Sequence, residues 1–287
     1  MPTLFCFGLG YSAQHYVREF GARFDRIVGT VRTREKAATL GSVEALVFDG
    51  ETASVEVTAA VSKADSLLVS IAPDKHGDPA LKHVADVIGG SNMSSIVYLS
   101  TIGVYGDHQG RWVDETTPAN PVNARSTERL AAEAAWQALG RRSGKAVAIL
   151  RLSGIYGPGQ SALNQLASGT AKRIVKPGQV FNRIHVADIA QAIDAAFSKR
   201  ADGVFNVSDD APTPAPEVIA YAANLLGVAP PPEIAYDVAE KTMTPMAKSF
   251  YGEVKRVRNT KLKNELGVTL RYPTYRDGLN AIHAKAV

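Results

Sequence analysis

The stretch that decides the fold lies at the start of the chain, where residues 3–13 read TLFCFGLGYSA. An apolar run, Thr3–Phe7, ends at Gly8, and apolar residues at helical spacing follow over residues 13–24. A short apolar run that is closed by a glycine and followed by a helical pattern is typical of a β-strand that turns sharply into a helix. The sequence therefore predicts a strand, a tight turn and a helix over residues 3–24.

The same alternation continues through the first half of the chain. Short apolar runs predict further strands at residues 26–31, 45–48, 66–70, 95–99 and 146–150. Between them, apolar residues recur at helical spacing over residues 34–40, 54–61, 79–89 and 125–139. Strands that alternate with helices build parallel sheets whose two faces are covered. We therefore expect an α/β fold with a Rossmann-type doubly wound parallel sheet.

The regular pattern ends after residue 151, where glycine and proline cluster at residues 157–159, 176–178 and 230–232. Such clusters mark turns and loops, so we expect a smaller mixed α/β C-terminal lobe. The Rossmann domain would span residues 1–157, and the smaller lobe most of residues 158–287. A helix predicted at residues 186–197 and a strand at Gly203–Val207 would return the chain to the first domain near residues 183–207.

The turn after the first strand matches the pattern G-x-G-x-x-A, formed by Gly8, Leu9, Gly10, Tyr11, Ser12 and Ala13. In a dinucleotide-binding turn the first glycine allows the tight turn, and the second lets the backbone approach a pyrophosphate. The small third residue keeps the helix close to the sheet, and the helix N-terminus offers free N–H groups to the phosphates. The motif predicts a dinucleotide site, and an ordinary strand-to-helix turn is the alternative.

The end of the second strand indicates which dinucleotide is bound. An acidic residue there would accept hydrogen bonds from the ribose hydroxyls of NAD, and the sequence has none at residues 29–34. It has Arg32 and Arg34 instead, together with Thr30 and Thr33, and guanidinium groups suit a 2′-phosphate. The sequence therefore favours NADP(H) as the cofactor and leaves NAD possible.

Composition narrows the remaining classes of function. The net charge is +4, but both signs are interspersed, so a nucleic-acid partner is not expected. The single cysteine, Cys6, excludes an internal disulfide and a thiolate metal cluster, and the spacing of the six histidines predicts no metal site. No apolar run is long enough to cross a membrane, and the first residues do not read as a signal peptide, so we expect a cytoplasmic protein.

Further segments make nearly the whole chain resemble the short-chain dehydrogenase/reductase superfamily, in its extended branch of NAD-dependent epimerases and dehydratases and their atypical members. Besides the first turn, these segments are residues 48–49, 69–73, 99–106, 150–159 and 183–188. The resemblance implies that Asp49 contacts the adenine of the cofactor. It also implies that Ser70, Ile71 and Ala72 line the cofactor site.

The resemblance also locates the catalytic positions. In the family, a hydroxyl at the end of the fifth strand works with a tyrosine and with a lysine four residues further on. The hydroxyl position is Thr101, but the tyrosine and lysine positions fall on Arg125 and Arg129. An arginine stays protonated and cannot exchange a proton as a phenol does. The usual proton-transfer mechanism of the family is therefore not expected here.

Three hypotheses address this departure. Tyr105 could supply a displaced phenol, or Arg125 and Arg129 could bind an anionic group of the substrate or the nicotinamide ribose. Alternatively, Tyr105 packs under the substrate loop and the two arginines pair with Glu128 or Glu133. Two basic and aromatic segments near the C-terminus, residues 248–251 and 255–257, also have two interpretations. One is a surface for an acidic or phosphorylated substrate, and the other is a solvated helix face.

These observations predict an NADP(H)-dependent oxidoreductase-like enzyme that acts on a small polar molecule. Thr101 would orient the reacting group, and the protein would be a monomer or a homodimer. One alternative is a non-catalytic NADP(H)-binding sensor or regulatory protein that has lost the tyrosine–lysine pair. Another is a nucleotide-sugar epimerase or dehydratase.

Overall fold

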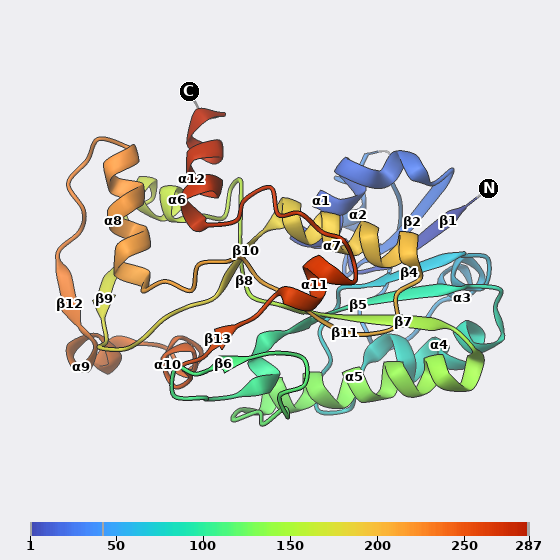
Figure 1. Cartoon of the computed structure of the whole chain (residues 1–287). Coiled ribbons are helices and arrows are strands. Elements are labelled where there is room, and N and C mark those ends of the chain that lie inside the picture. The colour runs from blue at the N-terminus through green and yellow to red at the C-terminus, as the bar shows by residue number, and fades with distance from the viewer. Residues whose placement is uncertain (1, 42, 286–287) are drawn as a thin grey trace.

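The expected first strand, β1 (Thr3–Phe7), lies inside a seven-stranded sheet. The structure is a computed structural model and describes residues 2–41 and 43–285. The other strands of the sheet are β2 (Arg26–Val31), β3 (Glu44–Val47), β4 (Ser66–Val69), β5 (Ser95–Thr101), β7 (Ala146–Leu152) and β11 (Gly203–Val207). Their order is β11-β7-β5-β4-β1-β2-β3, and every pair is parallel (Figure 1). The order reverses between β1 and β4, where doubly wound sheets bind their ligands.

Helices cover both faces of this sheet. On one face lie α1 (Tyr11–Phe20) and α7 (Val186–Lys199), and on the other lie α3 (Val55–Ser62), α4 (Pro79–Gly90) and α5 (Ala124–Ser143). Side chains alternate along β1, so that Leu4 and Cys6 join the first core while Phe5 and Phe7 join the second. Both cores are buried, which explains why the strand is apolar throughout.

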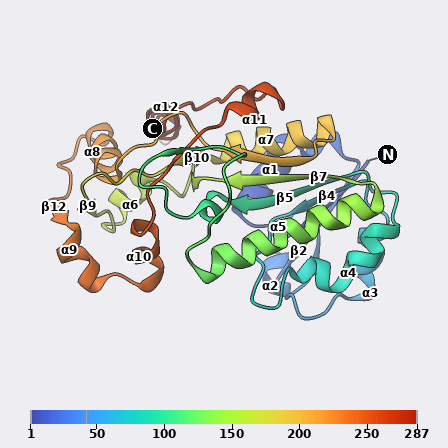
Figure 2. The same ribbon diagram turned by 60° about the horizontal axis from the view of Figure 1, so that its bottom comes forward.

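The second lobe is built from short elements. Three two-stranded pairs join β8 (Gly154–Tyr156) to β10 (Arg183–His185), β9 (Arg173–Val175) to β12 (Glu233–Ala235), and β6 (Trp112–Val113) to β13 (Arg256–Val257). Its helices are α6 (Ala162–Ala167), α8 (Ala215–Leu225), α9 (Tyr236–Ala239), α10 (Pro245–Tyr251) and α12 (Tyr275–Ala284). Figure 2 shows this lobe at one end of the sheet, beyond β5 and β7.

The remaining elements are α2 (Arg34–Ala37), α11 (Thr260–Asn264) and three 3₁₀ turns, η1 (Gly21–Arg23), η2 (Ile102–Tyr105) and η3 (Glu240–Thr242). Strands β1, β2 and β11 have the bounds expected from the sequence, and β11 pairs with β7 as the seventh strand of the sheet. Strands β5 and β7 each run two residues further than expected, to Thr101 and Leu152. No helix in the described part of the chain is both long and apolar enough to cross a membrane.

Candidate functional site

The turn after β1 has the geometry of an anion cradle. Gly8 has φ +87°, and a Cβ there would lie 2.8 Å from Cγ2 of Ile71, so this position requires glycine. Gly10 is the N-cap of α1, and a Cβ on it would meet no atom within 4 Å. Neither a side-chain cap nor an acidic residue occupies the first turn of α1. Open space in front of free N–H groups fits the pyrophosphate of a dinucleotide.

Two residues of β2 hold this turn in place. The backbone N–H of Gly8 donates to Oγ1 of Thr30 (2.9 Å), and that of Leu9 donates to the Thr30 carbonyl (2.8 Å). A Cβ on Gly29 would lie only 2.6 Å from the side chain of Leu9, so Gly29 makes room for the turn. The sequence analysis did not identify Gly29, because its role depends on a neighbouring strand rather than on the motif.

A cavity of about 930 Å³ opens beside the turn, at the carboxyl ends of β1, β2 and β4. Eight of the expected cofactor residues line it: Gly8, Leu9, Gly10, Arg32, Asp49, Ser70, Ile71 and Ala72. Thr33, expected beside a 2′-phosphate, lines it as well, and so does Lys36, which was not predicted from the sequence. The structure thus gathers Arg32, Lys36 and two threonine hydroxyls, from Thr30 and Thr33, at one end of the cavity.

Four of the expected cofactor residues lie outside this lining. Arg34 begins α2, and Lys36 is the residue of that helix that faces the cavity, because positions two residues apart point to different sides. Ala13 and Ser12 are buried in the packing of α1 against the sheet. The hydroxyl of Tyr11 donates to the carbonyl of Pro158 (3.0 Å) and so ties the first helix to the loop after β8.

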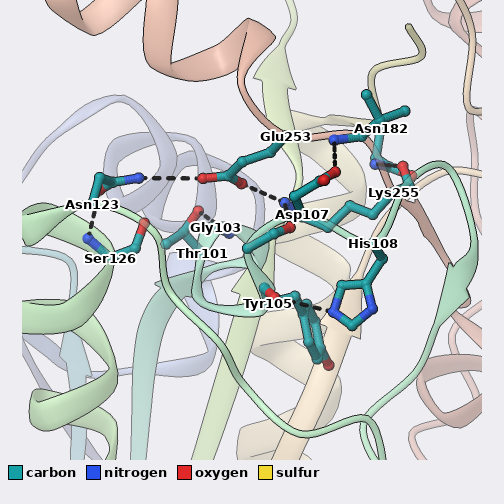
Figure 3. Close-up of polar contacts among 12 residues, drawn as sticks. Thr101, Gly103, Tyr105, Asp107, His108, Asn123, Ser126, Asn182, Glu253 and Lys255 are labelled. Carbon is teal, nitrogen blue, oxygen red and sulfur yellow. Dashed lines mark hydrogen bonds and ion pairs between the residues drawn. The ribbon is translucent and has the colours of Figure 1, made fainter. Parts of the chain in front are cut away.

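A second cavity, of about 510 Å³, lies at the carboxyl ends of β5 and β7, and Ala72 lines both cavities. Thr101 ends β5 in this cavity, and its Oγ1 accepts a hydrogen bond from the Gly103 N–H (3.1 Å; Figure 3). A Cβ on Gly103 would lie 2.9 Å from Oγ of Ser126 and 3.4 Å from Oγ1 of Thr101. The glycine therefore allows both hydroxyls to lie beside this backbone. Ser126 had no role in the sequence analysis.

Arg125 and Arg129, at the tyrosine and lysine positions, both line the second cavity, but their hydrogen bonding differs. Nη1 of Arg129 donates to the carbonyls of Ile71 (3.2 Å) and Leu99 (3.1 Å) and to the hydroxyl of Tyr98 (3.0 Å). Arg125 is exposed and has no hydrogen-bond or ion-pair partner in the described ranges.

The expected pairing of these arginines with Glu128 or Glu133 is wrong. Glu133 forms a buried ion pair with Arg151, whereas Arg129 is bonded to carbonyls and a hydroxyl. The prediction failed because β7 brings Arg151 to the buried face of α5. Sequence spacing along one helix gives no sign of this contact.

The structure also contradicts the hypothesis that Tyr105 supplies a displaced phenol. The 3₁₀ turn η2 directs its side chain away from the cavity, and its hydroxyl donates to Oδ1 of Asn206 (2.8 Å). The tyrosine is fully buried, with the guanidinium of Arg151 4.7 Å from its ring centre, and burial raises the pKa of its phenol. Tyr105 is therefore a packing residue, as the alternative hypothesis had it.

A chain of polar contacts forms one wall of the second cavity (Figure 3). Nδ2 of Asn123, the N-cap of α5, donates to Oε1 of Glu253 (3.2 Å). The other carboxylate oxygen of Glu253 accepts from Nζ of Lys255 (2.5 Å), which also donates to the Gly106 carbonyl (2.8 Å). Asn182 fixes the segment just before β13, because its Nδ2 donates to the Lys255 carbonyl (2.9 Å). Lys255 is thus a buried, paired cation and does not lie on a solvated face.

The opposite part of the cavity is apolar. Met246 and Phe250 of α10 line it and are 56% and 58% exposed, although both are large hydrophobic residues. Val180 and Phe181 line it as well. The basic and aromatic segment at residues 248–251 therefore does reach the cavity, through Ser249 and Phe250.

The site has clear chemical limits. Among the residues that the structure describes, no tyrosine lines the second cavity, so this lining offers no phenol to exchange a proton. Hydroxyls from Thr101, Ser126, Ser153 and Ser249 line it instead, together with the free guanidinium of Arg125. Such a set can bind and orient a polar group, and a dinucleotide in the first cavity would adjoin it at Ala72.

Comparisons with known proteins agree with this geometry. A model of the NAD dependent epimerase/dehydratase family matches residues 80–208. Among curated relatives, Protein YeeZ of Escherichia coli strain K12 is 27% identical over 281 residues, which cover 93% of this chain and 94% of YeeZ. A 3-diazoavenalumate denitrifying reductase from a Streptomyces species is 28% identical over 139 residues, 46% of this chain and 45% of that protein.

Solved structures extend the likeness to the whole chain. A functionally unknown conserved protein from Silicibacter pomeroyi DSS is 44% identical, with a TM-score of 0.89 over 100% of this chain and 99% of that one. UDP-glucuronic acid 4-epimerase from Bacillus cereus, solved in complex with NAD, is 15% identical, with a TM-score of 0.79 over 98% and 96% of the two chains. The second likeness concerns the fold alone.

Proposed function

Because a model of the NAD dependent epimerase/dehydratase family matches residues 80–208, we propose that the chain belongs to this family, in the extended branch of the short-chain dehydrogenases/reductases, and that it is an NADP(H)-dependent oxidoreductase acting on a small polar molecule. The observation that carries this proposal is the junction of the two cavities at Ala72. When bound, the nicotinamide would supply or accept a hydride. The protein's own residues would hold the substrate beside it.

The preference for NADP(H) rests on the groups at the end of β2. Arg32 and Lys36 line that end of the first cavity together with Thr30 and Thr33, and no carboxylate lies at residues 29–34. Two cations and two hydroxyls suit a 2′-phosphate, which a carboxylate would repel. The NAD complexes of family neighbours make NAD the competing cofactor.

A side-by-side calorimetric titration with NADPH and NADH tests the cofactor. We expect NADPH to bind more tightly, and Arg32→Gln and Lys36→Gln each to weaken NADPH binding by about 10- to 100-fold while leaving NADH binding unchanged. Arg34→Gln is the matched control, because Arg34 lies outside the cavity lining. Equal affinities for the two cofactors would remove the NADP(H) preference, and binding of neither would overturn the proposal.

Two residues would position the reacting groups. Thr101 Oγ1 can donate to a carbonyl or hydroxyl of the substrate, since it only accepts a bond from Gly103. Arg129 makes its bonds through Nη1, which leaves Nη2 and Nε to meet the nicotinamide ribose. The proton would then come from water or from the substrate, because no phenol lines the cavity.

The second candidate is a non-catalytic NADP(H)-binding sensor. Its support is the replacement of the tyrosine and lysine by Arg125 and Arg129. A reductase among the curated relatives favours the enzyme instead. Oxidation of NADPH by the protein with a panel of small carbonyl compounds separates the two, because a sensor would bind NADPH without consuming it under any condition. Interconversion of UDP-glucose and UDP-galactose would point to an epimerase.

A further inference from the structure

Cationic side chains outnumber carboxylates among the described residues that line the second cavity. Three cationic side chains line it, Arg125, Arg129 and Lys255, against the single carboxylate of Glu253. Glu253 is paired with Lys255 at 2.5 Å, and their side chains are 11% and 6% exposed, so this pair is internally neutral. Arg129 is bonded to three neutral acceptors. In the proposed function, the remaining nitrogens of Arg129 meet the nicotinamide ribose. Arg125 is the cation of this lining that has no hydrogen-bond or ion-pair partner among the described residues, so its guanidinium is the one left for a substrate.

Small hydrogen-bond donors line the same cavity as Arg125. It lies in the first turn of α5, one residue before Ser126, and Thr101 lies across Gly103 from that serine. A planar guanidinium can bind a carboxylate through two parallel hydrogen bonds, and serine and threonine hydroxyls can donate to the same oxygens. This end of the cavity is therefore suited to one compact anion.

The helix that carries the apolar side chains, α10, is held in place by contacts at its last residue. Tyr251, the last residue of α10, is held by the rings of Phe181 (5.3 Å between centroids) and Tyr236 (5.1 Å), and its carbonyl accepts from Nζ of Lys176. Phe250 and Met246 nevertheless line the cavity with more than half of their surface exposed. Large apolar side chains that are left uncovered beside a cavity, on a helix whose last residue is held in place, mark a surface for an apolar ligand.

We propose that the substrate is a small organic monoanion with a flat apolar body, such as an aryl carboxylate. Arg125 would bind its carboxylate, and Met246 and Phe250 would cover its body. This inference rests on the proposed function, because the second cavity is taken as the substrate site. A nucleotide sugar carries a polar sugar, which does not match the apolar side chains of Met246 and Phe250.

The test is calorimetric titration with benzoate, trans-cinnamate and 3-phenylpropionate, each with and without saturating NADP⁺. The neutral amide of each acid is its matched partner, and UDP-glucose is the competing ligand class. We expect at least one acid to bind about tenfold more tightly than its amide, and UDP-glucose not to displace it. If no acid in the panel is preferred over its amide, or if UDP-glucose alone binds, the inference is overturned.

Substitutions of Arg125 and Phe250 test whether these two residues bind the acid. Arg125→Gln is expected to remove the preference for the acid, whereas Phe250→Ala weakens acid and amide alike. Arg142→Gln, an exposed arginine in the last turn of the same helix, is the control and should change neither. An unchanged preference in Arg125→Gln would contradict the role of Arg125. A protein that binds NADPH but none of the acids disproves the inference alone, whereas failure to bind NADPH disproves the proposed function.

Discussion

Glu133 and Arg151 form an ion pair inside the protein, with Nη2 of Arg151 2.8 Å from Oε2 of Glu133 and with side chains only 3% and 7% exposed. The hydroxyl of Ser100 donates to the same carboxylate. The pair joins α5 to β7, and Ser100 adds β5, so these contacts hold α5 against the two strands whose carboxyl ends lie at the second cavity. Removing one partner of such a buried pair leaves an uncompensated charge.

We expect Glu133→Gln to lower the free energy of unfolding by about 3–5 kcal/mol. The double variant Glu133→Leu with Arg151→Met should lose less, because neither charge then remains buried without a partner. Urea unfolding followed by circular dichroism measures both. A double variant as unstable as the single one would show that packing, rather than charge pairing, dominates at this position.

The two glycines of the first turn are expected to respond differently to substitution. Gly8→Ala strains a residue at φ +87° and places its Cβ 2.8 Å from Ile71, so it should destabilise the fold by about 1–3 kcal/mol. Gly10→Val points into open space, so it should leave the melting temperature unchanged and abolish NADPH binding. Thermal melts and cofactor titrations of both variants check this. Intact NADPH binding in Gly10→Val would place the cofactor elsewhere.

Tyr105→Phe tests the packing role of Tyr105. The substitution removes one hydrogen bond, to Oδ1 of Asn206, and keeps the ring beside Arg151. We expect a loss of about 1 kcal/mol in the free energy of unfolding and no change in NADPH affinity. A variant that binds NADPH normally but loses turnover with an identified substrate would restore the phenol hypothesis.

The sequence predicted the sheet well because each strand is a continuous apolar run, which buried parallel strands require. It also predicted most of the expected residues that line the first cavity, because Gly8, Gly10 and Arg32 belong to one strand–helix–strand segment and the residue that follows it. It did not predict the contacts between segments far apart in the chain. Glu253, for example, joins Asn123 to Lys255 just before β13, which pairs with β6, and both strands are only two residues long.

Two buried titratable groups at and near β10, His185 and Asp209, make opposing contributions to the pH dependence of stability. His185 is packed against the rings of Tyr272 (4.1 Å) and Tyr156 (5.1 Å), and burial lowers its pKa to about 4. Asp209 is 1% exposed, and burial raises its pKa to about 7. In the described chain, Nε2 of His185 and Oδ2 of Asp209 have no hydrogen-bond partner.

The two groups act in opposite directions as the pH falls. Between pH 6.5 and 4 the unfolded chain takes up a proton on His185 that the native protein does not, so stability decreases. Between pH 7 and 4 the native protein carries a proton on Asp209 that the unfolded chain does not, so stability increases. The two effects largely cancel in the wild type. A variant that lacks one of the two groups should therefore show the pH dependence of stability that the other group causes.

We therefore expect His185→Asn, which can still cap α7 through Ala187, to gain about 3 kcal/mol in stability relative to the wild type when the pH falls from 7.5 to 4.5. Asp209→Asn should change in the opposite direction and lose about 3 kcal/mol relative to the wild type over the same range. Urea unfolding of the three proteins at both pH values measures this, and each difference from the wild type removes the contribution of all other carboxylates. Shifts of the same sign in both variants would mean that the two groups do not titrate as their burial requires.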